Sequence, residues 1–295
     1  VPELQTMEDN LGILGNFGDN WLAYDQDGGF QNLELPLGQG FYLALSQDSN
    51  LQLSGDPVIS SNLDQLADLE LEKGWTLASN PLVTIVDKNT LEVVYDGESK
   101  SYGDAVLAGW IAPHVIGWFE DTHYPSDHLV PWGGYWFHTS RPLTVKVRPH
   151  LPLESSARIA DNSFSINLTA QPVDGLSGGD FVNMSVKDGA NDSFKYGEDE
   201  FDHPNPVMSS FVDLYFNKHE WIGSTDENGI MVDNPYFARD VRSSEIDNHV
   251  WNISGKAYNV TGDINLSWSM SNIDQEAYLL VGDDAYDMRE GSSIT

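Results

Sequence analysis

The sequence predicts an all-β protein with a few short helices, built from two tandem β-rich repeats followed by a β-sandwich. Apolar and polar residues alternate over many short segments, as they do in half-buried strands. A pattern of aromatic strands recurs along the first half of the chain. After a proline-containing stretch at 148–152, the sequence pattern changes to short alternating segments. A length of 295 residues suits about two domains.

The repeat joins an aromatic strand, a loop, a Pro-Gly turn, a second aromatic strand and an alternating strand. At an offset of 94 residues, Gly40 corresponds to Gly134 and Tyr42 to Trp136. The same offset places 22–24 on 116–118 and 51–53 on 145–147. The second copy opens with a segment at 73–81 that the first copy lacks, so we expect the first copy to be cut short by about 20 residues.

We expect three domains: a truncated first β-rich repeat at 1–58, a complete second β-rich repeat at 59–150, and an immunoglobulin-like β-sandwich at 151–295. Pro149 and Pro152 would make the connection to the sandwich stiff and extended. Short alternating segments predict the strands of the sandwich at 164–168, 181–186, 211–216, 250–253, 264–268 and 277–281. Short helices are expected at 6–14, 61–67 and 102–110.

The chain is strongly acidic: 46 Asp and Glu residues against 14 Lys and Arg residues give a formal net charge of −32. This charge argues against nucleic acid and against anionic membrane surfaces as partners. It suits a salty or calcium-rich exterior, where counterions screen the repulsion. No apolar run approaches the roughly 20 residues of a membrane span, so membrane insertion is not expected. The absence of cysteine removes disulfides and thiolate chemistry.

Several segments of the sequence resemble segments of known secreted proteins. The segments GWTLASNP at 74–81 and PWGGYWF at 131–137 resemble a repeat of modular secreted and cell-surface bacterial proteins of the type IX secretion kind, which end in a sorting domain. The phrases at 237–242, 250–253, 264–268 and 286–289 resemble a hook-capping-like, immunoglobulin-type β-sandwich of the same proteins. The resemblance implies an extracellular or cell-surface location and supplies no catalytic residues.

We therefore expect a non-catalytic extracellular structural or adhesive module of a large surface or filament-forming protein, and not an enzyme. Its partners would be neighbouring copies, other surface proteins or glycans. The alternatives are a carbohydrate-binding module and an accessory region of a secreted hydrolase. Two segments match only part of a catalytic motif. A predicted strand directly follows Gly175–Gly179, where a nucleophile elbow needs a helix. Gly223 occupies the position at which a zincin motif beginning at His219 needs its second histidine.

No cofactor is required by the sequence, and calcium is the metal that its acidic loops would bind. Calcium takes six to eight oxygen ligands from flexible loops, and solvated acidic loops are the alternative explanation. The candidate calcium ligands are Asp188, Asp192, Glu198, Asp199, Asp202, Asp283, Asp284 and Asp287. Four histidines between 114 and 138 have no spacing typical of zinc ligands, so we expect them to be surface loop histidines, with a metal site beside Glu120, Asp121 and Asp127 as the alternative.

Two further sets of residues are candidates for sugar chemistry. Exposed indole rings would form a platform on which glycans stack. Side chains alternate between the two faces of a strand, so one set of aromatic rings is expected to lie in the core. The candidates for the platform are Trp118, Trp132 and Trp136. Sequons mark candidate glycosylation sites, although chance also explains many of them; they lie at Asn167, Asn183, Asn191, Asn252, Asn259 and Asn265.

Overall fold

The described part of the protein is mostly β, with 53% of its residues in strands and 5% in helices. The computed structural model describes residues 15–26, 38–47, 67–82, 84–119, 121–131, 133–147, 164–175, 177–206, 210–246, 248–273 and 275–295. Its contacts divide the chain into two compact units, the first comprising 1–117 and 125–153, the second 118–124 and 154–295. The expected helix at 6–14 and the predicted boundaries at 58/59 and 150/151 lie outside the described residues. In the described part, no helix is long and apolar enough to cross a membrane.

Two four-stranded antiparallel sheets carry most of the first unit. One has the order β4-β11-β8-β9 and the other β3-β12-β6-β7. The strands of the first sheet are β4 (Gly74–Ser79), β11 (Gly134–Thr139), β8 (Val115–Phe119) and β9 (Thr122–Ser126). Those of the second are β3 (Ala67–Leu71), β12 (Leu143–Val147), β6 (Glu92–Tyr95) and β7 (Glu98–Ser101). Short elements complete the unit: β5 (Val86–Asp87), which pairs with β10 (His128–Leu129), the 3-10 helix η2 (Lys88–Thr90) and the helix α2 (Tyr102–Leu107).

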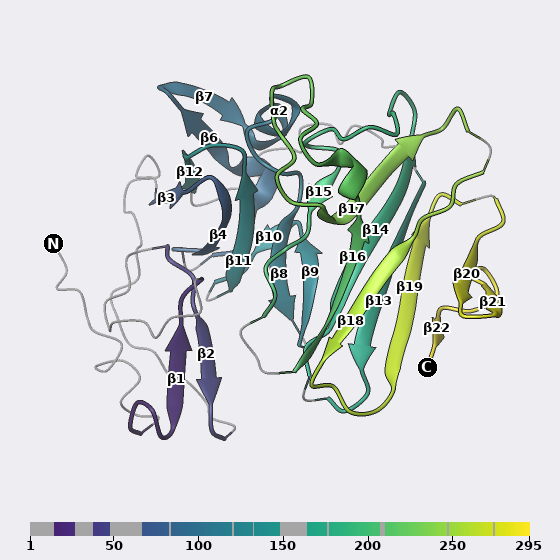
Figure 1. The fold of residues 1–295 in the computed structure, drawn as a ribbon. Coiled ribbons are helices and arrows are strands. Elements are labelled where there is room, and N and C mark those ends of the chain that lie inside the picture. The colour runs from purple at the N-terminus through teal and green to yellow at the C-terminus, as the bar shows by residue number, and fades with distance from the viewer. Residues whose placement is uncertain are drawn as a thin grey trace, which may run out of the picture. The chain divides into compact units, whose positions relative to one another are not determined.

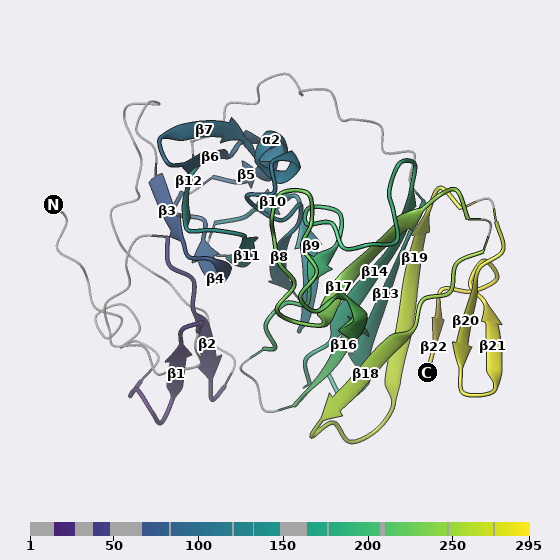
Figure 2. The same ribbon diagram turned by 45° about the horizontal axis from the view of Figure 1, so that its top comes forward.

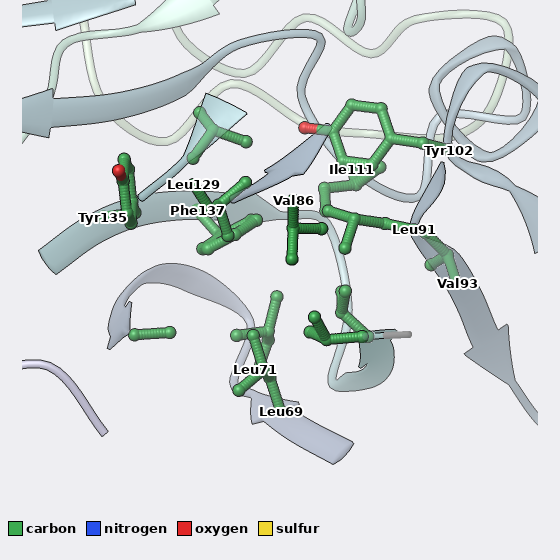
Figure 3. Close-up of a cluster of buried hydrophobic side chains, with 14 of the residues drawn as sticks. Leu69, Leu71, Val86, Leu91, Val93, Tyr102, Ile111, Leu129, Tyr135 and Phe137 are labelled. Atoms are coloured by element: carbon green, nitrogen blue, oxygen red, sulfur yellow. The ribbon is translucent and has the colours of Figure 1, made fainter. Parts of the chain in front are cut away.

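The core of the first unit lies on the faces where alternating apolar residues meet (Figure 3). Strand β12 buries Leu143, Val145 and Val147, and its intervening residues are half-buried, as a period of two requires. Phe137 of β11 is fully buried and points into the same cluster. Tyr102 of α2 is also buried there, and its hydroxyl donates to the Ala112 carbonyl at 2.8 Å, so its polar end is satisfied.

Helix α2 forms within the predicted 102–110 segment. The Ser101 side chain accepts a hydrogen bond from the Asp104 backbone N–H, which caps the first turn. The hairpin that precedes it, β6–β7, turns at Asp96 and Gly97, whose φ angles are 49° and 77°. An Asp-Gly pair in the left-handed region is the preferred two-residue hairpin turn, so this connection follows from local sequence.

The first-copy residues form a hairpin, β1 (Trp21–Tyr24) with β2 (Tyr42–Leu45), drawn in purple in Figure 1. The aligned strands of the second copy, β8 and β11, also pair antiparallel, with Trp136 opposite Ile116. The register differs by two residues, because Tyr42 lies opposite Tyr24 rather than Leu22. A shift of two keeps each side chain on its face, so both copies present the same pattern.

The second unit contains an eight-stranded mixed sheet, visible in Figure 2. Its order is β18-β16-β17-β14-β13-β19-β22, and β15 also pairs with β17. The strands are β13 (Phe164–Pro172), β14 (Asp180–Lys187), β15 (Glu200–Phe201), β16 (Phe211–Asn217), β17 (Tyr236–Ser243), β18 (Ile253–Tyr258), β19 (Ile264–Ser271) and β22 (Ser293–Ile294). A separate hairpin pairs β20 (Tyr278–Val281) with β21 (Asp284–Asp287), and η3 (His219–Trp221) is a 3-10 turn.

Strand β14 occupies the middle of this sheet and is buried on both faces except at its last residue. It pairs antiparallel with β13 and parallel with β17. Its inward polar groups bond to one another: Asn183 donates to Asn167 Oδ1 at 2.6 Å, and the Ser185 hydroxyl donates to Asn183 Oδ1 at 2.7 Å. Buried polar side chains need such partners, because each unpaired one costs free energy.

Two sequence-based expectations need correction. The segment at 250–253 is not a strand over its length, since β18 starts at Ile253 and runs to Tyr258. Ala67, expected in a helix, begins strand β3, whose alternating burial fits its pairing with β12. The other residues of that predicted helix lie outside the described residues. Ala, Leu and Glu favour helices only weakly, and tertiary pairing overrides that preference.

The F137A variant tests the importance of the first core. Phe137 is 0% exposed, so we expect the substitution to lower the free energy of unfolding by about 3–5 kcal/mol through lost burial and an unfilled cavity. Leu107 is 76% exposed on α2 and offers the matched control; L107A should change stability by less than about 0.5 kcal/mol. Urea unfolding of the full chain measures both, and equal effects would contradict this assignment of the core.

Candidate metal centre

Three side chains from distant parts of the chain meet in the interior of the second unit. They are His123, Asp180 and His203, which are 2%, 3% and 5% exposed. Their potential ligand atoms all lie within 4.8 Å of one another. Asp180 belongs as well to a second group, in which the carboxyl oxygens of Asp202 and Asp213 satisfy the same criterion. Histidine nitrogens beside carboxylate oxygens are the donor set of many metal centres.

His123 is placed by the tip of the β8–β9 hairpin, which belongs to the second unit. Thr122 forms an isolated bridge with Gly179, and the Gly179 N–H donates to the Asp121 carbonyl at 2.7 Å. A Cβ on Gly179 would lie 2.8 Å from both the Ala170 carbonyl oxygen and Thr122 Oγ1. Glycine is therefore required at this position, because only its bare backbone allows the hairpin tip to approach β14 so closely.

Asp180 is the first residue of β14, directly after the turn at 175–179. That turn is held by Asp174, whose carboxylate accepts from the Ser177 N–H at 2.9 Å and from its hydroxyl at 2.7 Å. Asp180 Oδ2 accepts the Leu214 N–H at 2.8 Å. Asp180 Oδ1 has no hydrogen-bond partner in the structure and lies 3.2 Å from His203 Nε2 and 3.9 Å from His123 Nδ1.

His203 follows the short strand β15. The backbone bond from the Asp202 N–H to the Tyr236 carbonyl, at 3.0 Å, fixes the chain beside it. Its ring lies 4.4 Å from the His123 ring and 5.2 Å from the Phe181 ring, measured between centroids. Its Nε2 is buried and makes no well-directed hydrogen bond, although it lies only 3.2 Å from Asp180 Oδ1. The His123 ring meets Trp118 edge-on at 4.7 Å, so aromatic rings enclose both imidazoles.

Burial favours the uncharged form of each group in this cluster. It lowers the pKa of His123 to about 3. It also lowers the pKa of His203 to about 4, and the Asp180 charge opposes this shift only partly. Burial raises the pKa of Asp180 against the influence of His203, and burial followed by repulsion from Asp180 raises the pKa of Asp213 to about 6. The two imidazoles are therefore unprotonated at neutral pH, the form that binds metals.

Sequence reasoning missed this centre. His123 was expected to be a surface histidine, and that expectation is wrong, because the hairpin tip is packed into the second unit. Asp180 and His203 drew no attention, since the three residues are separated by 57 and 23 positions and show no local spacing. A weak signal exists at Asp180, where a carboxylate opens a strand with apolar residues at alternate positions.

The candidate calcium ligands are mostly engaged with other protein groups. Asp188 and Asp192 accept hydrogen bonds from Ser244 Oγ and the Ser243 N–H. Glu198 forms ion pairs with Lys187 and Lys195, at 3.3 Å and 3.5 Å. Asp287 pairs with Arg289 at 2.7 Å, and Asp283 and Asp284 are exposed at the β20–β21 turn. Asp202 is the member of this set that the structure brings into a potential ligand group. Calcium binding by these loops stays a prediction.

Asp199 of the same set is buried and turned toward the backbone. Its two carboxylate oxygens accept the N–H groups of Lys195 and Val241, each at 2.9 Å. Burial raises the pKa of Asp199 to about 8, despite these two hydrogen bonds, which favour the ionised form. Both acceptor atoms are thus used inside the fold, which leaves this residue poorly placed for an ion in an exposed loop.

The candidate glycan platform is not assembled as three exposed rings. Trp136 is 4% exposed, and its Nε1 donates to the Tyr42 hydroxyl at 2.9 Å, so it offers no face to a sugar. Trp118 is half-buried against His123, and Trp132 lies outside the described residues. Stacking on Trp118 stays a prediction.

The sequon asparagines fall into two groups. Asn183 is buried and donates to Asn167 across paired strands, which leaves no space for a glycan on Asn183. Asn265 is half-buried on β19, whereas Asn191, Asn252 and Asn259 are exposed. Glycosylation at the exposed sites stays a prediction.

A scan against protein-family models finds no match for this chain, and searches of curated proteins and of solved structures find none either.

The G179A variant tests the docking of the hairpin tip. The added methyl group would collide with the Ala170 carbonyl, so we expect a loss of stability of about 1–3 kcal/mol. Gly103 of α2 has open space around its Cβ position, and G103A serves as the control, with no loss of stability and a gain of at most about 1 kcal/mol. Thermal unfolding of both variants measures the effect; a G179A protein as stable as G103A would contradict the close approach.

Asp199 gives the second unit a pH-dependent stability. The folded state holds a proton on this carboxyl up to about pH 8, whereas the unfolded state releases it near pH 4. Folding is therefore favoured at low pH, and this contribution is lost as pH rises from 4 to 8. Relative to D199N, the wild-type chain should lose stability by about 1.4 kcal/mol per pH unit in that window. Urea unfolding at pH 5, 6, 7 and 8 measures the difference, and a constant difference would disprove the shift.

Proposed function

We propose that this chain is a non-catalytic structural or adhesive module of a large extracellular or cell-surface protein. The observation that carries the proposal is the use of aromatic side chains as interior filling. Tyr102, Tyr135 and Phe137 in the first unit, and Phe216 and Phe237 in the second, are almost completely buried. Rings placed in this way stabilise sheets and are not available to a substrate.

The proposed location outside the cell rests on composition and on the resemblance of the sequence phrases to modular surface proteins. A net charge of −32 keeps copies apart at low salt and is screened in a saline exterior. The absence of cysteine is compatible with such a location, because units of this size bury enough apolar surface without disulfides. These features favour a hydrated surface protein that resists nonspecific association.

We propose in addition that the second unit is an immunoglobulin-like sandwich and that the first contains two related repeats. Strand β13 supports the sandwich, because burial alternates along it, as expected when one face of a sheet packs on a core and the other is more open. The similar pairing of β1 with β2 and of β8 with β11 supports the repeats.

The proposed partners are neighbouring copies or other surface proteins, and the surface proposed for contact is the β18 edge. Strand β18 ends the sheet order, and residues 255–258 on it are exposed. An edge strand offers unpaired backbone groups, to which another strand can be added. Lys256 lies on this edge and is attracted to acidic chains, because its side chain is a cation on a strongly anionic protein.

Self-association of the full chain, measured by analytical ultracentrifugation between about 1 and 100 µM protein at about 0.1 and 0.5 M NaCl, tests the proposal. Association should be stronger at the higher salt concentration, because screening weakens the repulsion between the acidic chains. A257D places a negative charge on the β18 edge and should weaken association about fivefold, or by about 1 kcal/mol. G103D adds the same charge at an exposed site on α2 and should leave association unchanged.

Three outcomes would count against this function. A chain that stays monomeric under all conditions and does not adhere to beads coated with the same protein would contradict it. Equal effects of A257D and G103D would refute the β18 edge as the contact surface. Saturable binding of a monomeric chain to a glycan array, lost on substitution of Trp118, would favour a carbohydrate-binding module instead.

A further inference from the structure

We propose that His123, Asp180 and His203 bind one divalent transition-metal ion, with zinc as the best-fitting ion, at a closed structural site in the second unit. The proposal is independent of the module's function. It rests on the donor atoms, their distances, their missing hydrogen bonds and the charge around them.

The donor set is two imidazole nitrogens and one carboxylate oxygen. Zinc binds histidine nitrogen and carboxylate oxygen at about 2.0–2.2 Å, usually with four ligands in a tetrahedron. Ligand atoms in such a tetrahedron are about 3.3 Å apart. His203 Nε2 lies 3.2 Å from Asp180 Oδ1, and His123 Nδ1 lies 3.9 Å from the same oxygen. Side-chain shifts of less than about 1 Å would therefore bring the three donors to coordination distance.

Two of the three donor atoms lack hydrogen-bond partners. His203 Nε2 and Asp180 Oδ1 are buried without a hydrogen bond. On His123 the unpaired atom is Nε2, whereas the nitrogen near Asp180 is Nδ1. A buried polar atom left unpaired costs about 1–3 kcal/mol, and most proteins avoid it. Two such atoms 3.2 Å apart call for a ligand that accepts lone pairs from both, as a metal ion does.

The surrounding charge points in the same direction. Asp240, which is equally buried, is compensated by Lys218 at 2.7 Å and Arg242 at 2.9 Å. Asp180 instead lies beside two imidazole rings and shares its surroundings with Asp202 and Asp213. Carboxylates close together repel one another when ionised, and a bound cation removes that repulsion. The cluster thus brings carboxyl groups together without a basic side chain among the grouped residues, and a divalent ion would stabilise their ionised form.

The identity of the donors selects the ion. Calcium and magnesium prefer oxygen-only sites, so the two imidazoles disfavour them. Imidazole suits zinc, cobalt and nickel, and Asp202 and Asp213 supply further oxygen donors nearby. All three proposed ligands are at most 5% exposed, which is typical of closed structural sites rather than catalytic ones. The ion would join three segments that are distant in the sequence: the hairpin tip, the start of β14 and the residue pair after β15.

Metal analysis of the full chain, purified without a histidine tag, tests the proposal. The protein is stripped with a chelator, incubated with zinc, passed through a desalting column and analysed by mass spectrometry. We expect about one bound zinc per chain and an increase in Tm of about 5 °C. Cobalt in place of zinc should give the intense visible absorption of a four- or five-coordinate site with nitrogen and oxygen ligands.

Variants locate the ion. H123A, H203A and D180N should each weaken zinc binding at least tenfold and remove the cobalt absorption. D180N keeps the side-chain shape, so it remains informative if a histidine variant fails to fold by circular dichroism. His219 is an exposed histidine of the same unit, and H219A should bind zinc and cobalt as the wild type does.

Each of three results would overturn the proposal. The wild-type chain could retain no zinc after desalting. H123A, H203A and D180N could retain it as fully as H219A does. Calcium could raise the Tm while zinc does not, which would place an oxygen-only site elsewhere.

Discussion

A buried carboxylate must find compensating charge or hydrogen-bond donors inside the protein, and this requirement governs the second unit. The chain meets it in different ways at three aspartates. Asp240 uses two basic side chains, and Asp199 uses two backbone N–H groups. Asp180 has backbone hydrogen bonds but faces imidazoles that burial keeps neutral. With 14 basic residues against 46 acidic ones, cationic side chains are scarce, so an external cation is a reasonable third solution.

The first unit contrasts with this arrangement, because its main cluster of buried side chains is apolar. In that cluster the Tyr102 hydroxyl donates to the Ala112 carbonyl, and the Tyr135 hydroxyl accepts the Val130 N–H. Burial of apolar area is the main stabilising contribution of such a cluster. Both units therefore bury aromatic side chains, and the second unit adds a buried polar cluster that a metal ion would complete.

The sequence predicted what depends on local pattern. The alternation in 145–147 and 164–168, the helix within 102–110 and the aromatic strands around Tyr42 and Trp136 all act over a few residues. Strand β3 was not predicted, because its residues favour helices. Strand β17 was not predicted, because charged residues interrupt its apolar stretch. The candidate metal centre could not be predicted, because its residues meet only where Gly179 lets the hairpin tip that carries residue 123 approach residues 180 and 203. Its residues carry no shared periodicity or spacing.

The hydrogen bond between Trp136 Nε1 and the Tyr42 hydroxyl joins two positions that the 94-residue offset aligns. If the copies arose by duplication, corresponding sites have become each other's neighbours. Neither residue could then change independently of the other. Replacing the phenol would leave the indole N–H without an acceptor, and replacing the indole would leave the hydroxyl without its donor. Mutations at these two sites should accordingly arise as compensating pairs over evolutionary time.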